Sequence, residues 1–319
     1  MACYDVFNGD ADGLCALQQL RLEHPRDSVL ITGMKRDIGL LNQVPPSAGD
    51  SITVLDISLD KNRGALLALL DAGASVFYAD HHFPGDIPQH EAFDCHIDTA
   101  ADTCTSLIIN DLLEGTQARW AVVGAFGDNF DAQALKLGRS IGLDEDGLSL
   151  LQQLGICLNY NGYGFDLDDL LYHPAELSAL MRPFADPIEF IQHDSVYSNL
   201  VEQYEGDMTQ AQRAEERVVS DSGAIFYLPD ESWARRIVGV MGNDLTKQHP
   251  ERAHALLVEM GDGHYRVSVR APYQKREGAD ELCRQFPSGG GRKGAAGINQ
   301  LPESMLDRFV EAFNVQFGG

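Results

Sequence analysis

Two aspartates separated by one residue are the first side chains of this chain that could bind a metal. They stand in Asn8-Gly9-Asp10-Ala11-Asp12-Gly13, directly after an apolar run. An Asp-x-Asp pair in a turn presents two hard carboxylates to a common point, which suits Mg²⁺ or Mn²⁺. The pattern is also typical of a solvated turn, so it predicts a site only in the company of further ligands.

Further candidate ligands follow later apolar runs. Asp56 follows Ile52-Thr53-Val54-Leu55, and the triplet Asp80-His81-His82 follows Val76-Phe77-Tyr78-Ala79. Asp56 alone could simply cap a helix, but two adjacent histidines after a carboxylate are hard to explain by packing. Asp128, in Gly124-Ala125-Phe126-Gly127-Asp128-Asn129, adds a fourth carboxylate. The imidazoles favour Mn²⁺ over Mg²⁺.

A parallel sheet would bring these residues together. The first ~180 residues alternate β-rich runs with helical stretches, which is typical of such a sheet covered by helices. Ligands bind at the carboxyl ends of the strands in open α/β sheets, so the candidates should share one edge. The expected strands are Cys3–Phe7, Val29–Thr32, Ile52–Leu55, Val76–Ala79 and Ala121–Ala125, with helical spacing in Ala11–Glu23 and Lys61–Ala72.

The pattern changes after two prolines, Pro183 and Pro187. The Glu- and Gln-rich stretch that follows indicates a helical linker, and a second, smaller α/β domain should begin near Ser220. We therefore expect domains at 1–187 and 220–319 joined by a linker at 188–219. The expected strands of the second domain are Gly223–Tyr227, Ile237–Met241, Ala255–Glu259 and Arg266–Arg270.

The net charge of −24 argues against a long nucleic acid as partner. Residues 1–219 hold 12 basic against 35 acidic residues, a net of −23, whereas residues 220–319 hold 12 against 13, a net of −1. No apolar run approaches the ~20 residues that cross a bilayer, so no membrane partner is expected. The N-terminus lacks the features of a signal peptide, which predicts a cytoplasmic protein. The six scattered cysteines favour neither a disulfide framework nor a zinc ribbon.

These motifs, in this order, resemble those of the DHH phosphoesterases. The four N-terminal motifs of that family correspond to Asp10-Ala11-Asp12, Asp56, Asp80-His81-His82 and Asp128. The stretch from Gly289 to Gly297 is similar to the glycine-rich signature of the DHH-associated domain. The resemblance implies an α/β fold, with an N-terminal parallel-sheet DHH domain and a smaller C-terminal substrate-binding domain.

The resemblance also implies roles for individual residues. Two divalent cations are expected, with Mn²⁺ favoured for both and Mg²⁺ as the alternative. Asp56 would bridge them, Asp10 would bind the first, and Asp12, His81 and Asp128 would bind the second. His82 would act on the substrate, with Asp80 orienting an imidazole. Many members have histidine in place of Asn8, so whether Asn8 binds metal is left open.

Substrate contacts are expected from the C-terminal domain. Exposed N–H groups and cations near a glycine-rich stretch suit a phosphate, and Arg270 corresponds to a second phosphate-binding position of the family. The expected substrate-binding residues are Arg270, Gly289, Gly290, Gly291, Arg292 and Lys293. The aromatic segment Asn159–Phe165 could stack on a base, but we interpret it as a turn pinned by core aromatics.

The resulting hypothesis is a metal-dependent phosphodiesterase. It would hydrolyse short single-stranded oligonucleotides, such as nanoRNA or the 5′-phosphorylated dinucleotide pGpG, to mononucleotides. One alternative is a RecJ-like single-stranded DNA exonuclease. Another is a catalytically silent nucleotide-binding sensor. Three questions are left open: which base is preferred, whether the substrate is RNA or DNA, and whether the chain forms a homodimer.

Overall fold

The computed structural model describes residues 1–193 and 195–318, and only the backbone of residues 215–220. The chain forms two compact units, Met1–Glu202 and Gln203–Gly319. The range expected as a linker contains all but the first residue of α8 (Pro187–His193) and the whole of α9 (Ser195–Ala211), and the strand β6 (Glu215–Ser220) begins within it.

The first unit is built on a parallel five-stranded sheet in the order β2-β1-β3-β4-β5. Phe7 of β1 lies beside Leu55 of β3, and Leu55 lies beside Ala79 of β4. The residues that follow these three therefore meet at one edge of the sheet. The strands are β1 (Cys3–Asn8), β2 (Val29–Gly33), β3 (Ser51–Leu55), β4 (Ser75–Asp80) and β5 (Phe93–Ile97).

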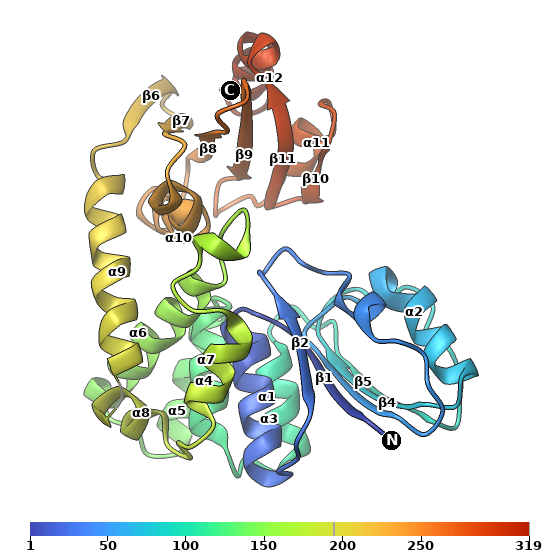
Figure 1. The fold of residues 1–319 in the computed structure, drawn as a ribbon. Coiled ribbons are helices and arrows are strands. Elements are labelled where there is room, and N and C mark those ends of the chain that lie inside the picture. The colour runs from blue at the N-terminus through green and yellow to red at the C-terminus, as the bar shows by residue number, and fades with distance from the viewer. Residues whose placement is uncertain (194, 319) are drawn as a thin grey trace. The chain divides into compact units, whose positions relative to one another are not determined.

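Helices cover both faces of this sheet (Figure 1). Leu66, Leu69 and Leu70 of α2 pack on one face, and α1 and α3 lie on the other. α4 packs against α1, α3, α5 and α6. None of the described helices is long and apolar enough to cross a membrane. The helices are α1 (Ala11–Glu23), α2 (Leu59–Asp71), α3 (Thr105–Leu112), α4 (Ala118–Gly127), α5 (Asp131–Ser140), α6 (Glu145–Asn161) and α7 (Pro174–Met181), with the short 3₁₀ helices η1 (Leu40–Gln43) and η2 (Leu167–Asp169).

The expected strand Ala121–Ala125 is wrong, because these residues lie in α4. Nearly every residue of α4 is buried, and a continuously apolar run has the same signature in a buried helix and a buried strand. Glycines permit this close packing: a Cβ at Gly127 would lie 2.2 Å from Cβ of Ala11. The fifth strand is instead the unexpected β5, a partly exposed edge strand in which Asp94 and His96 interrupt the apolar pattern.

The second unit holds a six-stranded mixed sheet in the order β10-β11-β9-β8-β7-β6. α10 packs against β8 and β9, while Phe309, Phe313 and Phe317 of α12 join α11 in the core on the opposite face. The remaining elements are β7 (Gly223–Leu228), α10 (Ser232–Gln248), β8 (Ala253–Glu259), β9 (His264–Arg270), α11 (Ala279–Cys283), β10 (Gly289–Arg292), β11 (Ala295–Pro302), η3 (Glu303–Met305) and α12 (Leu306–Phe317).

Two expectations for this unit need correction. Ile237–Met241 is not a strand but part of α10. Ala234, Ile237, Val238 and Met241 recur at helical spacing and are all buried, which is the stronger signal. The glycine-rich stretch is not an irregular loop either, because β10 and β11 pair as an antiparallel hairpin with Gly290 opposite Gly297.

Candidate metal centre

Asp10 lies at the start of α1, directly after the turn that ends β1. Its Oδ1 accepts the backbone N–H groups of Asp12 and Gly13, both at 3.1 Å. This is the arrangement of a helix N-cap, in which a short acidic side chain satisfies the first free N–H groups. The cap explains why the chain turns sharply here and presents a second aspartate one residue later.

Asp12 faces the start of α3. Its Oδ2 accepts the N–H of Thr105 at 2.8 Å, and its Oδ1 accepts the N–H of Ser106 at 2.7 Å. The hydroxyl of Thr105 donates to Oδ1 of Asp56 at 3.0 Å. The N-terminus of α3 thus holds two of the carboxylates in place. Sequence reasoning missed Thr105 and Ser106, because only the packing of α3 against α1 brings them here.

Asp56 occupies an unusual backbone conformation. Its φ of 58° lies in the left-handed region, which few residues other than glycine adopt. Its N–H donates to the carbonyl of Ala79 at 3.1 Å, so the residue remains attached to β4. Strain of this kind is concentrated at functional sites, where the surrounding structure maintains it.

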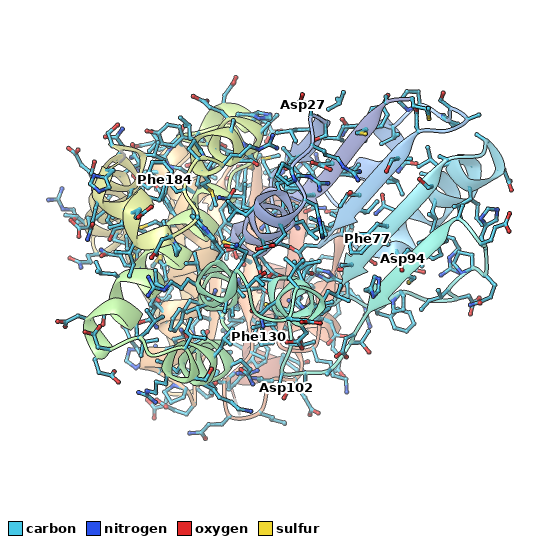
Figure 2. All side chains as sticks on the ribbon, turned by 90° about the horizontal axis from the view of Figure 1, so that it is seen from below. Asp27, Phe77, Asp94, Asp102, Phe130 and Phe184 are labelled. Carbon is cyan, nitrogen blue, oxygen red and sulfur yellow. The ribbon has the colours of Figure 1, made fainter. Side chains whose placement is uncertain are left out.

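The histidines and Asp128 complete the cluster. Nε2 of His81 lies 3.5 Å from Oδ1 of Asp56 and 3.6 Å from Oδ2 of Asp128. Asp128 follows α4 rather than a strand, but its carboxylate still reaches the same point. The ring of Phe130, labelled in Figure 2, packs edge-on against that of His81 at 5.9 Å.

The donor atoms fit a divalent cation. Among the described residues, the potential ligand atoms form two overlapping groups, each with all atoms within 4.8 Å of one another. One group is Asp12, His81 and Asp128, and the other is Asp56, His81 and His82. Carboxylate oxygens combined with imidazole nitrogens suit Mn²⁺, and Mg²⁺ less well.

The electrostatics of the cluster also favour a cation. Burial and the neighbouring carboxylates Asp12, Asp10 and Asp128 raise the pKa of Asp56 well above its ordinary value of 3.8. Burial likewise raises the pKa of Asp12, although His81 opposes that rise. A bound divalent ion would relieve this repulsion and keep both groups ionised.

Lys35 is the functional candidate that sequence reasoning missed. Its Nζ lies 2.6 Å from Oδ2 of Asp10, 3.0 Å from Oδ1 of Asp128 and 3.0 Å from Oδ1 of Asn159. Burial alone would lower the pKa of Lys35, but Asp10 and Asp128 raise it well above its ordinary value, so the amine is charged. Burial would in turn raise the pKa of Asp10, but Lys35 lowers it overall. The available signal was position, since Lys35 follows the end of β2 by two residues.

Asp80 and His82 form a hydrogen-bonded pair. Nδ1 of His82 lies 2.8 Å from Oδ1 of Asp80, whose side chain is fully buried, while that of His82 is 37% exposed. Oδ2 of Asp80 has no hydrogen-bond partner in the described part of the chain. An ionised carboxylate can only accept, so Nδ1 carries the proton and Nε2 is directed elsewhere.

Asn8 uses its amide for local structure. Its Oδ1 accepts the N–H of Asp10 at 3.3 Å, and its Nδ2 donates to the carbonyl of Lys35 at 3.4 Å. The segment Asn159–Phe165 begins inside α6, and Asn159 contacts Lys35. The interpretation of this segment as a turn apart from the site therefore needs correction.

In the second unit, strand register brings two expected substrate-binding residues onto one row. Arg270 of β9 pairs with Ala295 of β11, and Ala295 pairs with Arg292 of β10. Directly paired residues share a face of the sheet, and neighbouring strands lie ~4.8 Å apart. Arg270 is held by Asn243 of α10, through Nε and Oδ1 at 3.1 Å. Two arginines two strands apart form a surface suited to a phosphate.

The three glycines of the hairpin differ in what they permit. A Cβ at Gly289 would lie 1.8 Å from the carbonyl oxygen of Cys283, and Gly291 has a φ of 139°. Both are therefore required by the fold. Gly290 has open space where a side chain would be, so it is the one whose backbone a ligand could approach. The Arg292 and Lys293 side chains are exposed beside it.

The C-terminal unit matches a family model. The model is the DHHA1 domain, and it matches residues 220–318. The C-terminal unit therefore contains a DHHA1 domain.

Solved structures share the fold of the chain. They include exonuclease RecJ bound to manganese (17% identity, TM-score 0.65, 98% of this chain and 89% of that chain). The pGpG-specific phosphodiesterase PggH from Vibrio cholerae matches at 16% identity and a TM-score of 0.58, over 99% and 100% of the two chains. The DHH domain of PF0399 matches at 13% identity and a TM-score of 0.64, over 98% of this chain and 86% of that chain. At these identities the likeness shows the fold alone. No curated protein sequence matches the chain significantly.

Proposed function

We propose that the chain is a metal-dependent phosphodiesterase that hydrolyses short single-stranded oligonucleotides, including 5′-phosphorylated dinucleotides such as pGpG, to mononucleotides. The observation that carries the proposal is the convergence of Asp12, Asp56, Asp128 and His81 at one sheet edge. The names of two structural neighbours, a manganese-bound exonuclease and a pGpG phosphodiesterase, support the same reaction class.

The metal site would be formed by Asp10, Asp12, Asp56, His81 and Asp128. A divalent ion bound there would activate a water and neutralise charge on the phosphorus. The remaining steps belong to this chain's own side chains. As an imidazolium held at Nδ1 by Asp80, His82 would give its Nε2 proton to the leaving oxygen and return to the neutral ring with the remaining proton on Nδ1.

The second unit would contribute affinity for the nucleotide. Arg270 and Arg292 lie on one row of the sheet, and Gly290 and Lys293 lie beside them. Arginine binds phosphate through two parallel N–H donors and stacks on a base, so this row suits a nucleotide. The glycines at 289 and 291 would shape the hairpin rather than contact the ligand.

Charge favours a short substrate. Residues 1–219 carry a net charge of −23 from 12 basic and 35 acidic residues. A polyanion gains affinity mainly from cations that neutralise its phosphates. Each nucleotide beyond those held in the site should therefore add little binding free energy, because the negative charge of the first unit repels its phosphate.

The test is a panel of RNA and DNA substrates from dinucleotide to about 20-mer, each with Mn²⁺ and with Mg²⁺. We expect release of mononucleotides, with kcat/KM falling as length increases and a shallow dependence on salt. Asp56→Asn serves as the inactive control. No hydrolysis of any member with either ion would refute the proposal.

One rival function has specific support. The likeness to the exonuclease RecJ covers 89% of that chain, which supports a single-stranded DNA exonuclease as the rival proposal. Faster cleavage of long DNA than of dinucleotides, with a steep salt dependence, would favour it.

A further inference from the structure

A lysine side chain lies inside the carboxylate cluster. The Nζ of Lys35 contacts oxygens of Asp10, Asp128 and Asn159 at 2.6, 3.0 and 3.0 Å. Its side chain is 23% exposed, and that of Asp10 is 3% exposed. An ammonium with three oxygen neighbours is as well satisfied as its three N–H donors allow.

The backbone holds this lysine in position. The N–H of Lys35 donates to the carbonyl of Gly162 at 2.9 Å, and its own carbonyl accepts from Asn8 at 3.4 Å. A Cβ at Gly162 would lie only 3.1 Å from Cα of Asp10, so the end of α6 packs directly on the start of α1. The ring of Tyr163 lies 5.7 Å from Nζ. Lys35 is thus fixed from both sides, unlike a surface lysine that enters from solvent.

The ammonium uses the oxygens that one metal ion would need. Asp10 has its Oδ1 committed to the N-cap of α1 and its Oδ2 to Lys35. Asp128 gives Oδ1 to Lys35 and keeps Oδ2 directed toward His81. Among the described residues, neither group of potential metal ligands contains Asp10.

We propose that the Lys35 ammonium takes the place of the first of the two cations that the family resemblance implies, the one expected on Asp10. The chain then works with a single exchangeable divalent ion, held by Asp12, Asp56, His81 and Asp128. This inference deepens the proposed function and rests on it. An ammonium neutralises charge and can donate hydrogen bonds to a phosphate, but it cannot coordinate and activate a water. Water activation is therefore left to the single divalent ion.

The test counts metal ions and needs no substrate. The full chain is freed of metal with EDTA and titrated with Mn²⁺ by calorimetry and electron paramagnetic resonance, and ions per chain are measured by elemental analysis. The variant is Lys35→Met, which shortens the unbranched side chain by one atom and removes its charge. The matched control is Lys61→Met, because Lys61 is a 58% exposed lysine on α2 of the same unit.

We expect one Mn²⁺ per chain in the wild type and in Lys61→Met, with the spectrum of an isolated ion. Lys35→Met should bind two, with the broadened spectrum of a coupled pair, because Asp10 and Asp128 are released. Lys35→Arg keeps the charge and should stay at one. Two coupled ions in the wild type would overturn the inference, since the lysine would then give way to metal. An unchanged count in folded Lys35→Met would overturn it too.

Failure of the proposed function is a separate result. If no nucleotide of the panel is hydrolysed, the function is refuted whatever the metal counts are. If the wild type binds two ions and hydrolyses dinucleotides, the function stands and the Lys35 inference falls.

Discussion

The pair formed by Asp80 and His82 gives the sharpest test of the chemistry. We consider Asp80→Asn, which keeps the shape of the side chain and removes its charge. An asparagine can present either an oxygen or an N–H to Nδ1 of His82, so it no longer fixes where the ring proton lies. The carboxyl group is fully buried, and its bond to His82 is 2.8 Å long.

The size of the effect follows from this burial. A charge-assisted hydrogen bond away from water is worth about 1.5–3 kcal/mol, and each ~1.4 kcal/mol corresponds to tenfold in rate. We therefore expect kcat for a dinucleotide to fall between about tenfold and about a hundredfold. Bound Mn²⁺ should be unchanged, because Asp80 is not among the expected ligands.

A second Asp–His pair in the same unit provides the control. Asp94 and His96 of β5 are also 2.8 Å apart, but the Asp94 side chain is 67% exposed. Figure 2 labels Asp94 on the edge strand. Exposed pairs of this kind contribute little, so Asp94→Asn should leave kcat within about twofold of the wild type.

The assay compares two esters. In a dinucleotide the leaving oxygen needs a proton, whereas bis(p-nitrophenyl) phosphate releases an anion that is stable without one. Asp80→Asn should thus slow the dinucleotide much more than the nitrophenyl ester. In a double-mutant cycle, adding Asp80→Asn to His82→Ala should cost nothing further. Equal losses of kcat on both esters, or additive losses in the double-mutant cycle, would refute the assignment of the Asp80–His82 pair to protonation of the leaving oxygen.

Three further predictions follow from the site. Asp56→Asn should abolish turnover and lose bound Mn²⁺, whereas His82→Ala should keep its metal; equal metal loss in elemental analysis would contradict this. In the metal-free chain, the pKa values of Asp12 and Asp56 are raised in the folded state. The folded chain therefore holds protons that the unfolded chain has released. The resulting contribution to stability is present near pH 4 and is lost as pH rises through the pKa values of the folded state. The unfolding temperature measured in EDTA should therefore fall with rising pH, and saturating Mn²⁺ should remove this fall. An unfolding temperature in EDTA that does not change with pH would contradict the prediction. Arg292→Ala should raise KM for a dinucleotide roughly ten- to hundredfold with kcat nearly unchanged, and should leave bis(p-nitrophenyl) phosphate hydrolysis unaffected; equal impairment of both would mean that the arginine serves the fold.

Much of the candidate metal centre could be predicted because a parallel sheet turns sequence spacing into proximity. Asn8, Asp56 and Asp80 end or follow adjacent strands in register, so their meeting requires only the correct sheet. The placing of Arg270 and Arg292 on one row, each beside Ala295, depends on a hairpin register that periodicity alone does not give. The family resemblance named both arginines as phosphate contacts but not their register.

The missed features depend on helix packing. Lys35 and Asn159 are 124 positions apart and meet only because the end of α6 packs on the start of α1. α4 resembled a strand because burial on every side removes the periodic signal. Asp128 was nevertheless expected as a ligand, because the family motifs include it whichever element precedes it.

The left-handed backbone of Asp56 bears on how such a protein could evolve. Asparagine and glycine adopt a φ of 58° more readily than most residues, and either would remove a buried charge crowded by other carboxylates. A single substitution at position 56 would therefore relieve strain and repulsion together while ending the proposed hydrolysis. Descendants freed from selection for turnover have a short mutational route to a more stable, inactive nucleotide-binding protein. The same route means that a library screened for heat resistance alone would accumulate changes at this position.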